Sequence, residues 1–385
     1  MSWVETELRE QPAALERFLA AETAHATEIG RGLIRDDIRY LLIVSRGSSS
    51  NVARYLQYLF GTANRLTVAF ATPSLYTVYE APPNLDAAAV IAISQSGASP
   101  DVVAVLDEAK RQGRPTLAIT NNPRSPLAEA ADWVLPLHAG EERAVAATKT
   151  YLNSIAAVAL LSTVALGDDE RLRALRSAPA AVAKQIDLAL PVAPELTQYN
   201  DVESGTVVTR GVNYGTAFEI ALKIRELSGA PFEAFSSADL LHGPIAAVKP
   251  GRPAIVITRR GRTLDSMRGA IDKIRERGAE IIAISNDADF LASAQTAFPL
   301  VPDLPGWLAP LLTVVPGQVA AVELAKLRGA DIDSPTGLTK ITRTRLNRSS
   351  PLARAPSTTR VCVSPKKTSS GRGTRRRSSP SRSPR

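Results

Sequence analysis

Two serine-rich loops are the first places in this chain where chemistry is expected. One reads Gly47-Ser48-Ser49-Ser50, and the other reads Ser94-Gln95-Ser96-Gly97-Ala98-Ser99. Each follows an apolar segment typical of a strand and precedes a segment typical of a helix. A helix N-terminus offers free backbone N–H groups and partial positive charge, glycine lets the backbone approach a ligand, and serine hydroxyls add donors. The two loops therefore predict an anion site suited to a phosphate.

The candidate ligands of the phosphate are Ser48, Ser49, Ser94, Gln95, Ser96 and Ser99. Neither loop is a nucleotide P-loop, because no Gly-Lys-Ser/Thr follows, and neither is a dinucleotide fingerprint, because the Gly-x-Gly-x-x-Gly spacing is absent. Serines in such positions can also do no more than cap helices and tighten turns. The occurrence of two such loops in corresponding strand–loop–helix positions favours the anion site.

A second set of candidate residues lies on and after a helix predicted for 217–227. Glu219, Lys223 and Glu226 fall on roughly one face of this helix, and the first two can pair across one turn. His242 precedes Gly-Pro and is expected at a turn, where its ring is free to point into a site. A carboxylate and an imidazole so placed can move protons. On the residues alone, an exposed helix charge and a structural turn histidine stay as alternatives.

The serine loops and this helix belong to two copies of one plan. Gly47 corresponds to Gly211 and Gly97 to Gly261, both at a shift of 164 residues, and a third strand end near residue 119 recurs 165 residues later. Matched strand ends in near-constant register indicate a duplicated α/β domain. Only the first copy keeps hydroxyl-rich loops, so we expect one copy to hold the anion and the other to supply different groups.

Apolar strands alternate with helical stretches through both copies. Strands are predicted at Leu41–Val44, Leu66–Phe70, Ala88–Ile93, Thr116–Ile119 and Trp133–Leu137, and then at Val207–Thr209, Ala254–Ile257, Ile281–Ile284 and Ala297–Val301. Most intervening segments are long enough for crossover helices, which indicates parallel sheets. Ligands of such sheets sit beyond the carboxyl ends of the strands, where both serine loops would lie.

The chain is expected to divide into five parts. They are an N-terminal helical segment (1–40), a first α/β domain (41–190), a second α/β domain (198–328), a C-terminal segment (329–345) and a tail (346–385). The boundary between the domains is placed near Pro191–Gln198, where Pro and polar residues interrupt a helical pattern. The tail is rich in Ser, Arg and Pro and is predicted to be disordered. Either a functional basic arm or a shifted reading frame explains its composition.

Composition limits the class of protein. The chain has no unbroken run of about 18 apolar residues that would predict a membrane span, no secretory signal, and only one cysteine, Cys362, so a cytoplasmic protein without disulfides is expected. The net charge of +8 arises in the tail, because residues 343–385 carry 13 basic and no acidic residues. Nucleic-acid binding is therefore not expected, except through this tail. No metal-ligand cluster is visible, and the expected chemistry requires no cofactor.

Several short motifs between residues 5 and 345 match one known family. They are Glu10-Gln11-Pro12, Ser94-Gln95-Ser96-Gly97, Ala147-Thr148-Lys149, Glu226, Leu241-His242-Gly243-Pro244 and Pro335-Thr336-Gly337-Leu338-Thr339-Lys340. On these motifs the chain resembles the tandem SIS (sugar isomerase) domain family, in particular the isomerase half of glucosamine-6-phosphate synthase and its stand-alone relatives. The resemblance implies two duplicated SIS domains, each a flavodoxin-like three-layer sandwich with a parallel sheet flanked by helices.

The resemblance also implies roles for individual residues. The serine loops would bind the phosphate of a phosphorylated amino sugar, and Val145 and Ala147 would line the sugar site. Glu226 would move a proton between C1 and C2 of the open-chain sugar, and His242 would assist ring opening from the neighbouring subunit of a homodimer. Lys340 would form a Schiff base with a ketose carbonyl. A serine of the family is replaced by Ala147 here, which leaves the identity of the sugar open.

The resemblance implies an amino-sugar-6-phosphate deaminase/isomerase that converts glucosamine 6-phosphate, or a close relative, to fructose 6-phosphate and ammonia. Glutamine hydrolysis is not expected, because the synthase uses an N-terminal cysteine and positions 1–361 contain none. A fructosamine-6-phosphate deglycase and a galactosamine-6-phosphate-type enzyme are alternatives of the same class. A non-catalytic sugar-phosphate sensor is the alternative of another class, although residues 1–40 are too short and too acidic for a convincing DNA-binding helix-turn-helix.

Overall fold

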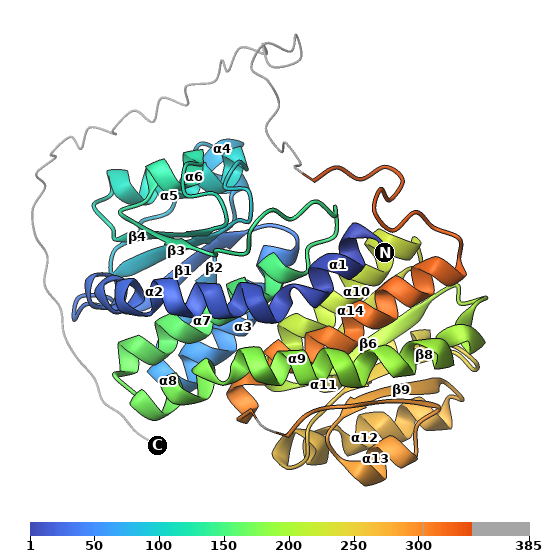
Figure 1. Cartoon of the computed structure of the whole chain (residues 1–385). Helices are drawn as coiled ribbons and strands as arrows, with labels where there is room; N and C mark the ends of the chain where they lie inside the picture. The colour runs from blue at the N-terminus through green and yellow to red at the C-terminus, as the bar shows by residue number, and fades with distance from the viewer. Residues whose placement is uncertain (303, 341–385) are drawn as a thin grey trace, which may run out of the picture. The chain divides into compact units, whose positions relative to one another are not determined.

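The computed structural model describes residues 1–302 and 304–340, and this part of the chain holds two five-stranded sheets (Figure 1). The first has the order β2-β1-β3-β4-β5, with β1 Tyr40–Ser45, β2 Thr67–Phe70, β3 Ala88–Ile93, β4 Thr116–Thr120 and β5 Trp133–Pro136. The second has the order β10-β9-β8-β6-β7, with β6 Gly205–Thr209, β7 Phe232–Ser236, β8 Pro253–Ile257, β9 Glu280–Ser285 and β10 Thr296–Pro299. All neighbouring strands are parallel, so both sheets repeat one topology.

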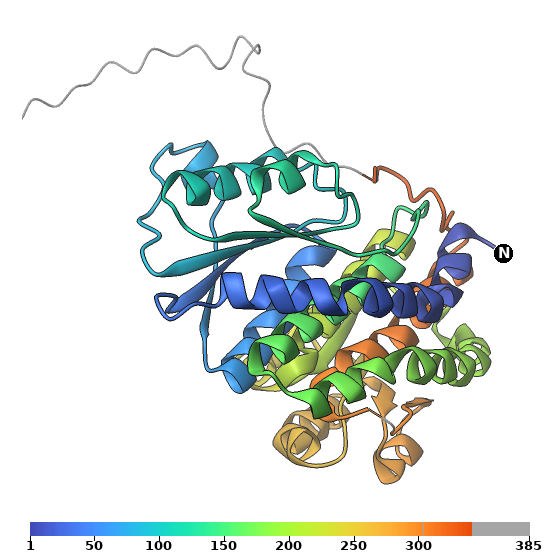
Figure 2. The same ribbon diagram turned by 60° about the vertical axis from the view of Figure 1, so that its left-hand side comes forward.

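Helices cover both faces of each sheet. The helices that precede β5 in the sequence are α1 (Trp3–Arg9), α2 (Gln11–Leu33), α3 (Ser48–Leu59), α4 (Ser74–Thr77), α5 (Pro100–Arg111) and α6 (Pro126–Ala130). The connection holds α7 (Lys149–Leu166), α8 (Asp169–Arg176) and α9 (Ala178–Ala189), and the second half holds α10 (Tyr214–Ser228), α11 (Ser237–Leu241), α12 (Arg262–Glu276), α13 (Ala288–Ala292) and α14 (Ala309–Leu327). Figure 2 shows α4, α5 and α6 on one side of the first sheet and α2, α3 and α7 on the other.

One apolar core joins the two sheets. It contains inward-facing residues of the first sheet, such as Ile43 and Ile91, together with residues of the second sheet, such as Val207 and Ile255. The helices α2, α3, α7, α10 and α14 contribute the rest of this cluster. The outer faces of the two sheets have smaller separate cores, which lie under α5 in the first half and under α12 in the second. The shared core places the two copies back to back.

Two helices of the shared core are unusually apolar. Lys149–Leu166 and Gly306–Leu327 are long and apolar enough to cross a membrane by length and mean composition alone. Neither is an unbroken run of apolar residues, which is why the sequence predicts no membrane span. They are 83% and 94% buried within the fold, and a core helix that is covered on all sides meets the same criterion. Their composition is therefore explained by burial against neighbouring elements.

One strand of the structure, β7, is not predicted from the sequence. Nine predicted strands are present with ends shifted by at most two residues, but no strand is predicted over Phe232–Ser236. This strand lies at the edge of the second sheet and is mostly half-exposed, so it lacks the continuous apolar run of the buried strands. A 3₁₀ helix, Leu190–Tyr199, occupies the predicted boundary between the domains. The predicted disordered tail, 346–385, lies outside the described residues.

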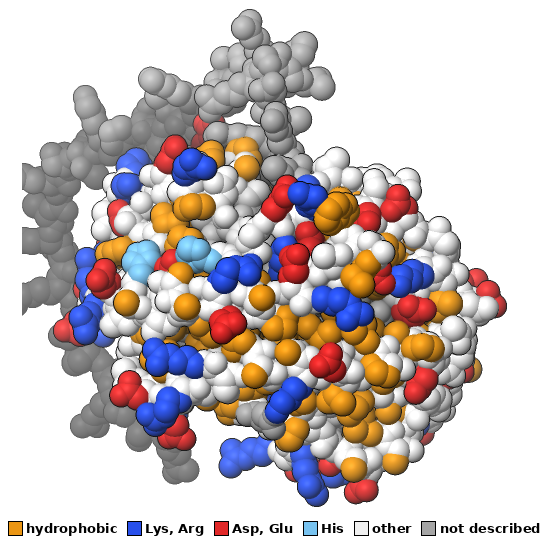
Figure 3. Space-filling model, in the orientation of Figure 1, with side chains coloured by type: hydrophobic (Ala, Val, Ile, Leu, Met, Phe, Trp, Pro, Cys, Tyr) orange, Lys and Arg blue, Asp and Glu red, His pale blue; other side chains and the backbone are white. Residues whose placement is uncertain are grey.

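An apolar groove crosses the surface between α2 and α9. Its volume is about 760 Å³, and its lining includes Pro12, Leu19, Pro179 and Ala183. Figure 3 shows apolar side chains gathered over this part of the molecule. None of the predicted site residues lines the groove, so it is separate from the serine loops.

Candidate functional site

The two serine loops meet at the carboxyl ends of adjacent strands. Ser45 at the end of β1 is the register partner of Ile93 at the end of β3, so the loops that follow are neighbours. Ser48 is the first residue of α3, and Ser99 is the residue before α5. Neither helix start is capped by a side chain. In the described part of the chain, the first N–H groups of α3 have no side-chain acceptor, as an anion site requires. At the start of α5, Pro100 has no N–H, and the Val102 N–H donates to Asp101 Oδ1 at 3.1 Å.

The hydroxyl groups of the serines divide into two kinds. Ser94 accepts a hydrogen bond from the N–H of residue 97 at 3.2 Å, and Ser96 accepts one from the N–H of residue 98 at 3.3 Å. These two serines tighten the turn, which is the alternative role that the sequence left open for them. The Ser49 and Ser99 hydroxyls have no hydrogen-bond partner in the described part of the chain, and Ser99 does not cap its helix. They are thus available to a ligand.

Gly97 fixes the shape of the second loop. Its φ is 62°, a left-handed conformation that favours glycine, and a Cβ there would lie 2.0 Å from the Ser125 Oγ. Ser125 caps α6 by accepting from the N–H of Ala128. The loop therefore packs closely against the start of α6, and no larger residue fits at position 97.

The helix α10 carries the carboxylates and packs against α3. Its second residue, Gly215, makes this possible, because a Cβ there would lie 2.1 Å from the backbone oxygen of Asn51. Asn51 Nδ2 donates to Glu219 Oε2 at 2.8 Å. The helix α10 of the second copy is thus fixed directly to the helix that begins at the serine loop of the first copy.

A buried lysine lies between the two carboxyl groups of α10. Lys223 Nζ is in direct contact with Glu226 Oε2 and lies 3.6 Å from Glu219 Oε1. Burial lowers the pKa of Lys223, but Glu219 and Glu226 outweigh it and hold that pKa above its ordinary value. Burial raises the pKa of Glu219, against the opposing effects of Lys223 and Asn51. The lysine therefore stays charged, and Glu226, with 25% of its side chain exposed, is the carboxylate that a substrate can reach.

The loop between β5 and α7 forms a socket for Lys340. Glu142 is fully buried there and accepts hydrogen bonds from the Thr148 N–H at 3.0 Å and from both the N–H and the hydroxyl of Thr150. Lys340 Nζ donates to Glu142 Oε2 at 2.9 Å and to the Ala144 oxygen at 2.5 Å. These two acceptors fix the position of the Lys340 Nζ.

The same loop connects Lys340 with the carboxylates of α10. The charge of Glu142 helps to raise the pKa of Lys223. The socket of Lys340 therefore lies close to the buried lysine of α10. Val145 and Ala147 are half-buried, while Ala144 and Ala146 between and before them are fully buried. This alternation leaves positions 145 and 147 partly accessible, as a lining of the sugar site requires.

His242 stands apart from these residues. It is the C-cap residue of α11, its N–H donates to the Asp239 oxygen at 3.1 Å, and its side chain is exposed. The turn expected there is present. Across the described ranges, no hydrogen bond or ion pair joins His242 to Glu226 or Lys340 of the same chain. Its exposure leaves it available to a second molecule.

Sequence reasoning missed two residues that shape this site. Asn51 connects the two copies, and Glu142 holds Lys340. Neither carries a sequence signal, because Asn51 follows three serines in a helix start and Glu142 lies in a charged loop. No set of three or more His, Cys, Asp or Glu side chains in residues 1–302 and 304–340 is arranged to hold a metal ion.

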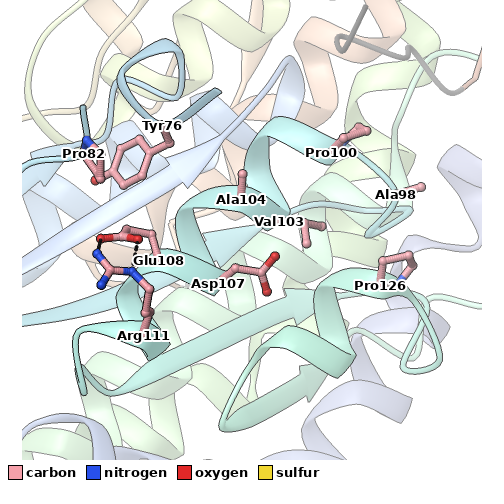
Figure 4. Close-up of a pocket in the computed structure, with 10 residues that line it drawn as sticks. All are labelled: Tyr76, Pro82, Ala98, Pro100, Val103, Ala104, Asp107, Glu108, Arg111 and Pro126. Carbon is pink, nitrogen blue, oxygen red and sulfur yellow. Dashed lines mark hydrogen bonds and ion pairs between the residues drawn. The ribbon is translucent and has the colours of Figure 1, made fainter. Parts of the chain in front are cut away.

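A separate groove on α5 does not have the character of a phosphate site. Its volume is about 400 Å³, and Figure 4 shows it between α4, α5 and α6, with Ala98 and Pro126 at one end and the paired Glu108 and Arg111 at the other. Asp107 projects from the middle of its lining. A lining with two carboxylates and one paired guanidinium offers little to an anion, and none of the predicted site residues lines it.

Comparisons with known proteins identify the repeat. The SIS domain family matches residues 37–164 and again residues 201–330. A glutamine–fructose-6-phosphate aminotransferase [isomerizing] of Thermus thermophilus is 33% identical over 348 residues, which cover 87% of this chain and 57% of that protein. The chain therefore spans little more than half the length of this relative.

Solved structures show the same architecture. A protein from Silicibacter pomeroyi DSS-3, provisionally classed as a phosphosugar isomerase, superposes with a TM-score of 0.79 at 31% identity and covers 86% of this chain and 100% of its own. The glucosamine-6-phosphate deaminase of Thermotoga maritima superposes with a TM-score of 0.71 at 22% identity, over 88% of this chain and 99% of its own. At the latter identity the likeness establishes the fold alone.

Proposed function

Since this chain belongs to the SIS domain family, we propose that it is an amino-sugar-6-phosphate deaminase/isomerase that converts glucosamine 6-phosphate, or a close relative, to fructose 6-phosphate and ammonia. The observation that carries the proposal is the direct packing of α10 against α3. It connects an uncapped anion site in the first copy with a lysine-paired carboxylate in the second. The names of the relatives support a sugar-phosphate substrate.

The substrate phosphate would bind at the serine loops. The free hydroxyls of Ser49 and Ser99 and the uncapped start of α3 provide donors, and Ser48, Ser94, Gln95 and Ser96 complete the loops. Backbone donors and helix N-termini favour a dianionic group without requiring a lysine or arginine. The sugar chain would then extend past Val145 and Ala147 towards α10.

Glu226 would act as the base in the open-chain sugar. It takes the proton from C2 and returns it to C1, so the C1 aldehyde becomes a hydroxymethyl group and the C2 amine becomes an imine. Water adds to the imine carbon and ammonia leaves, which gives the C2 ketone of fructose 6-phosphate. The neighbouring Lys223 ammonium stabilises the negative charge that develops on the sugar oxygens.

Lys340 would act after it leaves its socket. Lys340 Nζ is occupied by its contacts with Glu142 and with the Ala144 oxygen. Attack on a ketose carbonyl therefore requires that Lys340 release Glu142 and lose its proton. The resulting Schiff base would hold the ketose in its open-chain form.

The first experiment measures ammonia release from glucosamine 6-phosphate by the purified full chain, with no glutamine and no metal added. Ammonia and fructose 6-phosphate in equal amounts support the deaminase. Release only from galactosamine 6-phosphate or from a fructosamine 6-phosphate would assign the enzyme to those substrates, which the alanine at position 147 leaves open. Phosphosugar binding without any turnover would overturn the proposal in favour of a sensor.

We also propose that the enzyme is a cytoplasmic homodimer in which His242 serves the site of the neighbouring subunit. Glu226→Gln and His242→Asn chains, each inactive alone, are co-expressed to test this. A mixed dimer then has one site with both residues intact, so about a quarter of wild-type activity returns with random pairing. If His242 acts within its own chain, no mixed dimer has an intact site and the activity stays absent.

A further inference from the structure

The second sheet has an arginine-rich crevice where the first sheet has its serine loops. The strand order switches between β6 and β8, as it does between β1 and β3 in the first sheet. Val208 is the register partner of Val256, so the loops that follow these strands are neighbours. They contain Arg210-Gly211 and Arg259-Arg260-Gly261-Arg262. Four arginines thus lie at the edge where an open α/β sheet binds ligands.

Three of the four arginines have no direct carboxylate partner in the described part of the chain. Within residues 1–302 and 304–340, no carboxylate lies within 4.0 Å of Arg210, Arg259 or Arg262. Arg260 approaches Asp287, with 3.8 Å between Arg260 Nε and Asp287 Oδ2. Arginines elsewhere on α12 are paired, as with Arg268 and Asp265 at 3.3 Å. The crevice therefore differs from the ordinary solvated surface of the same helix.

Arg259 is the central residue of the crevice. It is half-buried, its Nη2 donates to the Leu304 oxygen at 2.9 Å, and its Nη1 is buried without a hydrogen-bond partner. Burial lowers the pKa of its guanidinium, and no carboxylate opposes this effect. A desolvated cation without a counter-ion costs free energy, and a bound anion would recover it. Arg259 occupies the position that Gln95 has in the first copy.

The backbone around Arg259 is open to a ligand. Gly211 and Gly261 have φ values of 76° and 102°, and a Cβ at either position would have no atom within 4 Å. The helix α12 has no side-chain cap at its start, so its first N–H groups add to the positive field. The buried hydroxyl of Thr258, which occupies the position of Ser94, also lacks a hydrogen-bond partner.

We propose that the loops after β6 and β8 form a second anion site, which binds the phosphate of a small phosphorylated metabolite through Arg259, with Arg210, Arg260 and Arg262 around it. A guanidinium group can bind phosphate oxygens in a bidentate way. Duplication would thus have kept the position of the phosphate site and changed its donors from hydroxyls to guanidinium groups. The site does not depend on the proposed catalysis, because no proposed catalytic residue lies in these loops.

The test measures binding of radiolabelled inorganic phosphate and pyrophosphate to the full chain by equilibrium dialysis. Wild type is expected to bind at two classes of site, the serine loops and the arginine crevice. Arg259→Gln places the residue of the first copy at this position, and the affinity of one class should fall at least about tenfold, with the other unchanged. A Ser49→Ala, Ser99→Ala double variant should weaken the opposite class.

Arg268→Gln is the matched control. It removes the same charge from α12 but from an arginine that pairs with Asp265, so its two affinities should equal those of wild type. Equal binding by Arg259→Gln and wild type would overturn the proposal. An equal loss in Arg268→Gln would also overturn it, because binding would then follow net charge, including that of the basic tail.

A second readout addresses variants that fold poorly. Phosphate should raise the unfolding temperature of wild type more than that of an Arg260→Gln, Arg262→Gln double variant, in which Arg259 keeps its bond to Leu304. An equal rise in both would contradict the site. Ammonia release in phosphate-free buffer tests the proposed function separately, since loss of the Arg259-dependent binding class and loss of catalysis are independent results.

Discussion

The buried lysine on α10 decides what the two carboxyl groups beside it can do. Lys223 has two acidic neighbours, of which Glu219 is fully buried and Glu226 reaches the surface. Burial raises the pKa of Glu219 and Lys223 opposes this effect, while both carboxyl groups raise the pKa of Lys223. A partly exposed carboxyl group with a buried cation beside it suits a proton-transfer step in which negative charge appears on the substrate.

Replacement of the base provides the most direct test at this scale. Glu226→Gln keeps the shape and the contact with Lys223 but cannot take a proton, so ammonia release should fall about 10² to 10⁴-fold. Phosphosugar affinity should stay within about threefold, because the phosphate loops are untouched. Arg225→Gln, at the exposed neighbouring position, is the control and should turn over like wild type. Unchanged turnover in Glu226→Gln would refute the assignment of the base.

Removal of the lysine should cost stability as well as activity. Lys223→Met leaves Glu219 without its buried counter-charge, which typically costs about 3 to 5 kcal/mol. Adding Glu219→Gln should recover part of that loss. The pKa of Lys223 is raised in the folded state, so its contribution is complete below the ordinary value of 10.5 and declines as the pH rises through the higher folded value. Urea unfolding between pH 7 and pH 11 should show this decline in wild type and not in Lys223→Met.

At the scale of elements, the site depends on how closely α10 approaches α3. The approach is set at one glycine, Gly215, whose missing side chain lets α10 contact the backbone of Asn51. Nothing in the amphipathic pattern of either helix specifies this distance. The contact brings Glu219 within hydrogen-bonding distance of the first turn of α3 and so joins the chemistry of the two copies.

A side chain at this contact should separate the two helices. Gly215→Ala places a Cβ 2.1 Å from the Asn51 oxygen, and we expect a loss of about 1 to 3 kcal/mol together with most of the activity. Gly269→Ala on α12 is the matched control, since a Cβ there meets nothing within 4 Å and an exposed helical glycine gains about 0.5 to 1 kcal/mol on replacement by alanine. Thermal unfolding and ammonia release measure both effects. Normal activity in Gly215→Ala would show that the approach is not required.

The first helix anchors the C-terminal segment that carries Lys340. Glu5 pairs with Lys326 of α14 at 2.6 Å, and Asp333 accepts the N–H groups of Trp3 and Val4 at the start of α1. Burial opposes ionisation of Glu5, but Lys326 and Ser2 outweigh it and lower its pKa from 4.5 to about 2. The helix α1 thus fastens the segment after α14 to the body of the protein.

The anchor makes stability depend on pH. The pKa of Glu5 is lower in the folded state, so its contribution is present above pH 4.5 and is lost as the pH falls towards about 2. Glu5→Gln should therefore cost about 1 to 2 kcal/mol at pH 7, after allowance for solvent screening, and almost nothing near pH 2. The difference between the two proteins in urea unfolding measures this. A difference that is constant over pH 2 to 7 would assign the loss to packing alone.

At the scale of the whole molecule, the two copies share one core, and each would contribute a different part of the proposed site. The first copy would provide the phosphate loops, the second the carboxylate, and Lys340 comes from beyond the second copy. The proposed site would be assembled from three separate parts of residues 1–340, and none of its described contacts involves residues 346–385.

Truncation tests this division. A chain that ends at Arg345 should release ammonia at the wild-type rate, because Lys340 and its socket are retained. A chain that ends at Pro335 lacks Lys340 and should lose at least about tenfold in turnover. Wild-type activity of the shorter chain would exclude a catalytic role of Lys340, and loss of activity in the longer one would assign a function to the tail.

The sequence by itself determined the duplication, the parallel sheets and the positions of most strands. Hydrophobic periodicity and repeated glycine positions are local signals, and both persist in the fold because buried strands and strand-end turns impose them. The same signals identify the serine loops and place Glu219, Lys223 and Glu226 on one helix face. The edge strand β7 was missed because a half-exposed strand needs no apolar run.

Only the tertiary structure decided how these pieces combine. The contacts of Asn51 with Glu219 and of Glu142 with Lys340 join residues that are 168 and 198 positions apart. Such contacts depend on the packing of distant elements and leave no periodic trace in the sequence. The contact of Asn51 with Glu219 depends on the missing side chain of Gly215. The charge states follow the same rule, because a pKa depends on burial and on neighbouring charges that only the folded chain brings together.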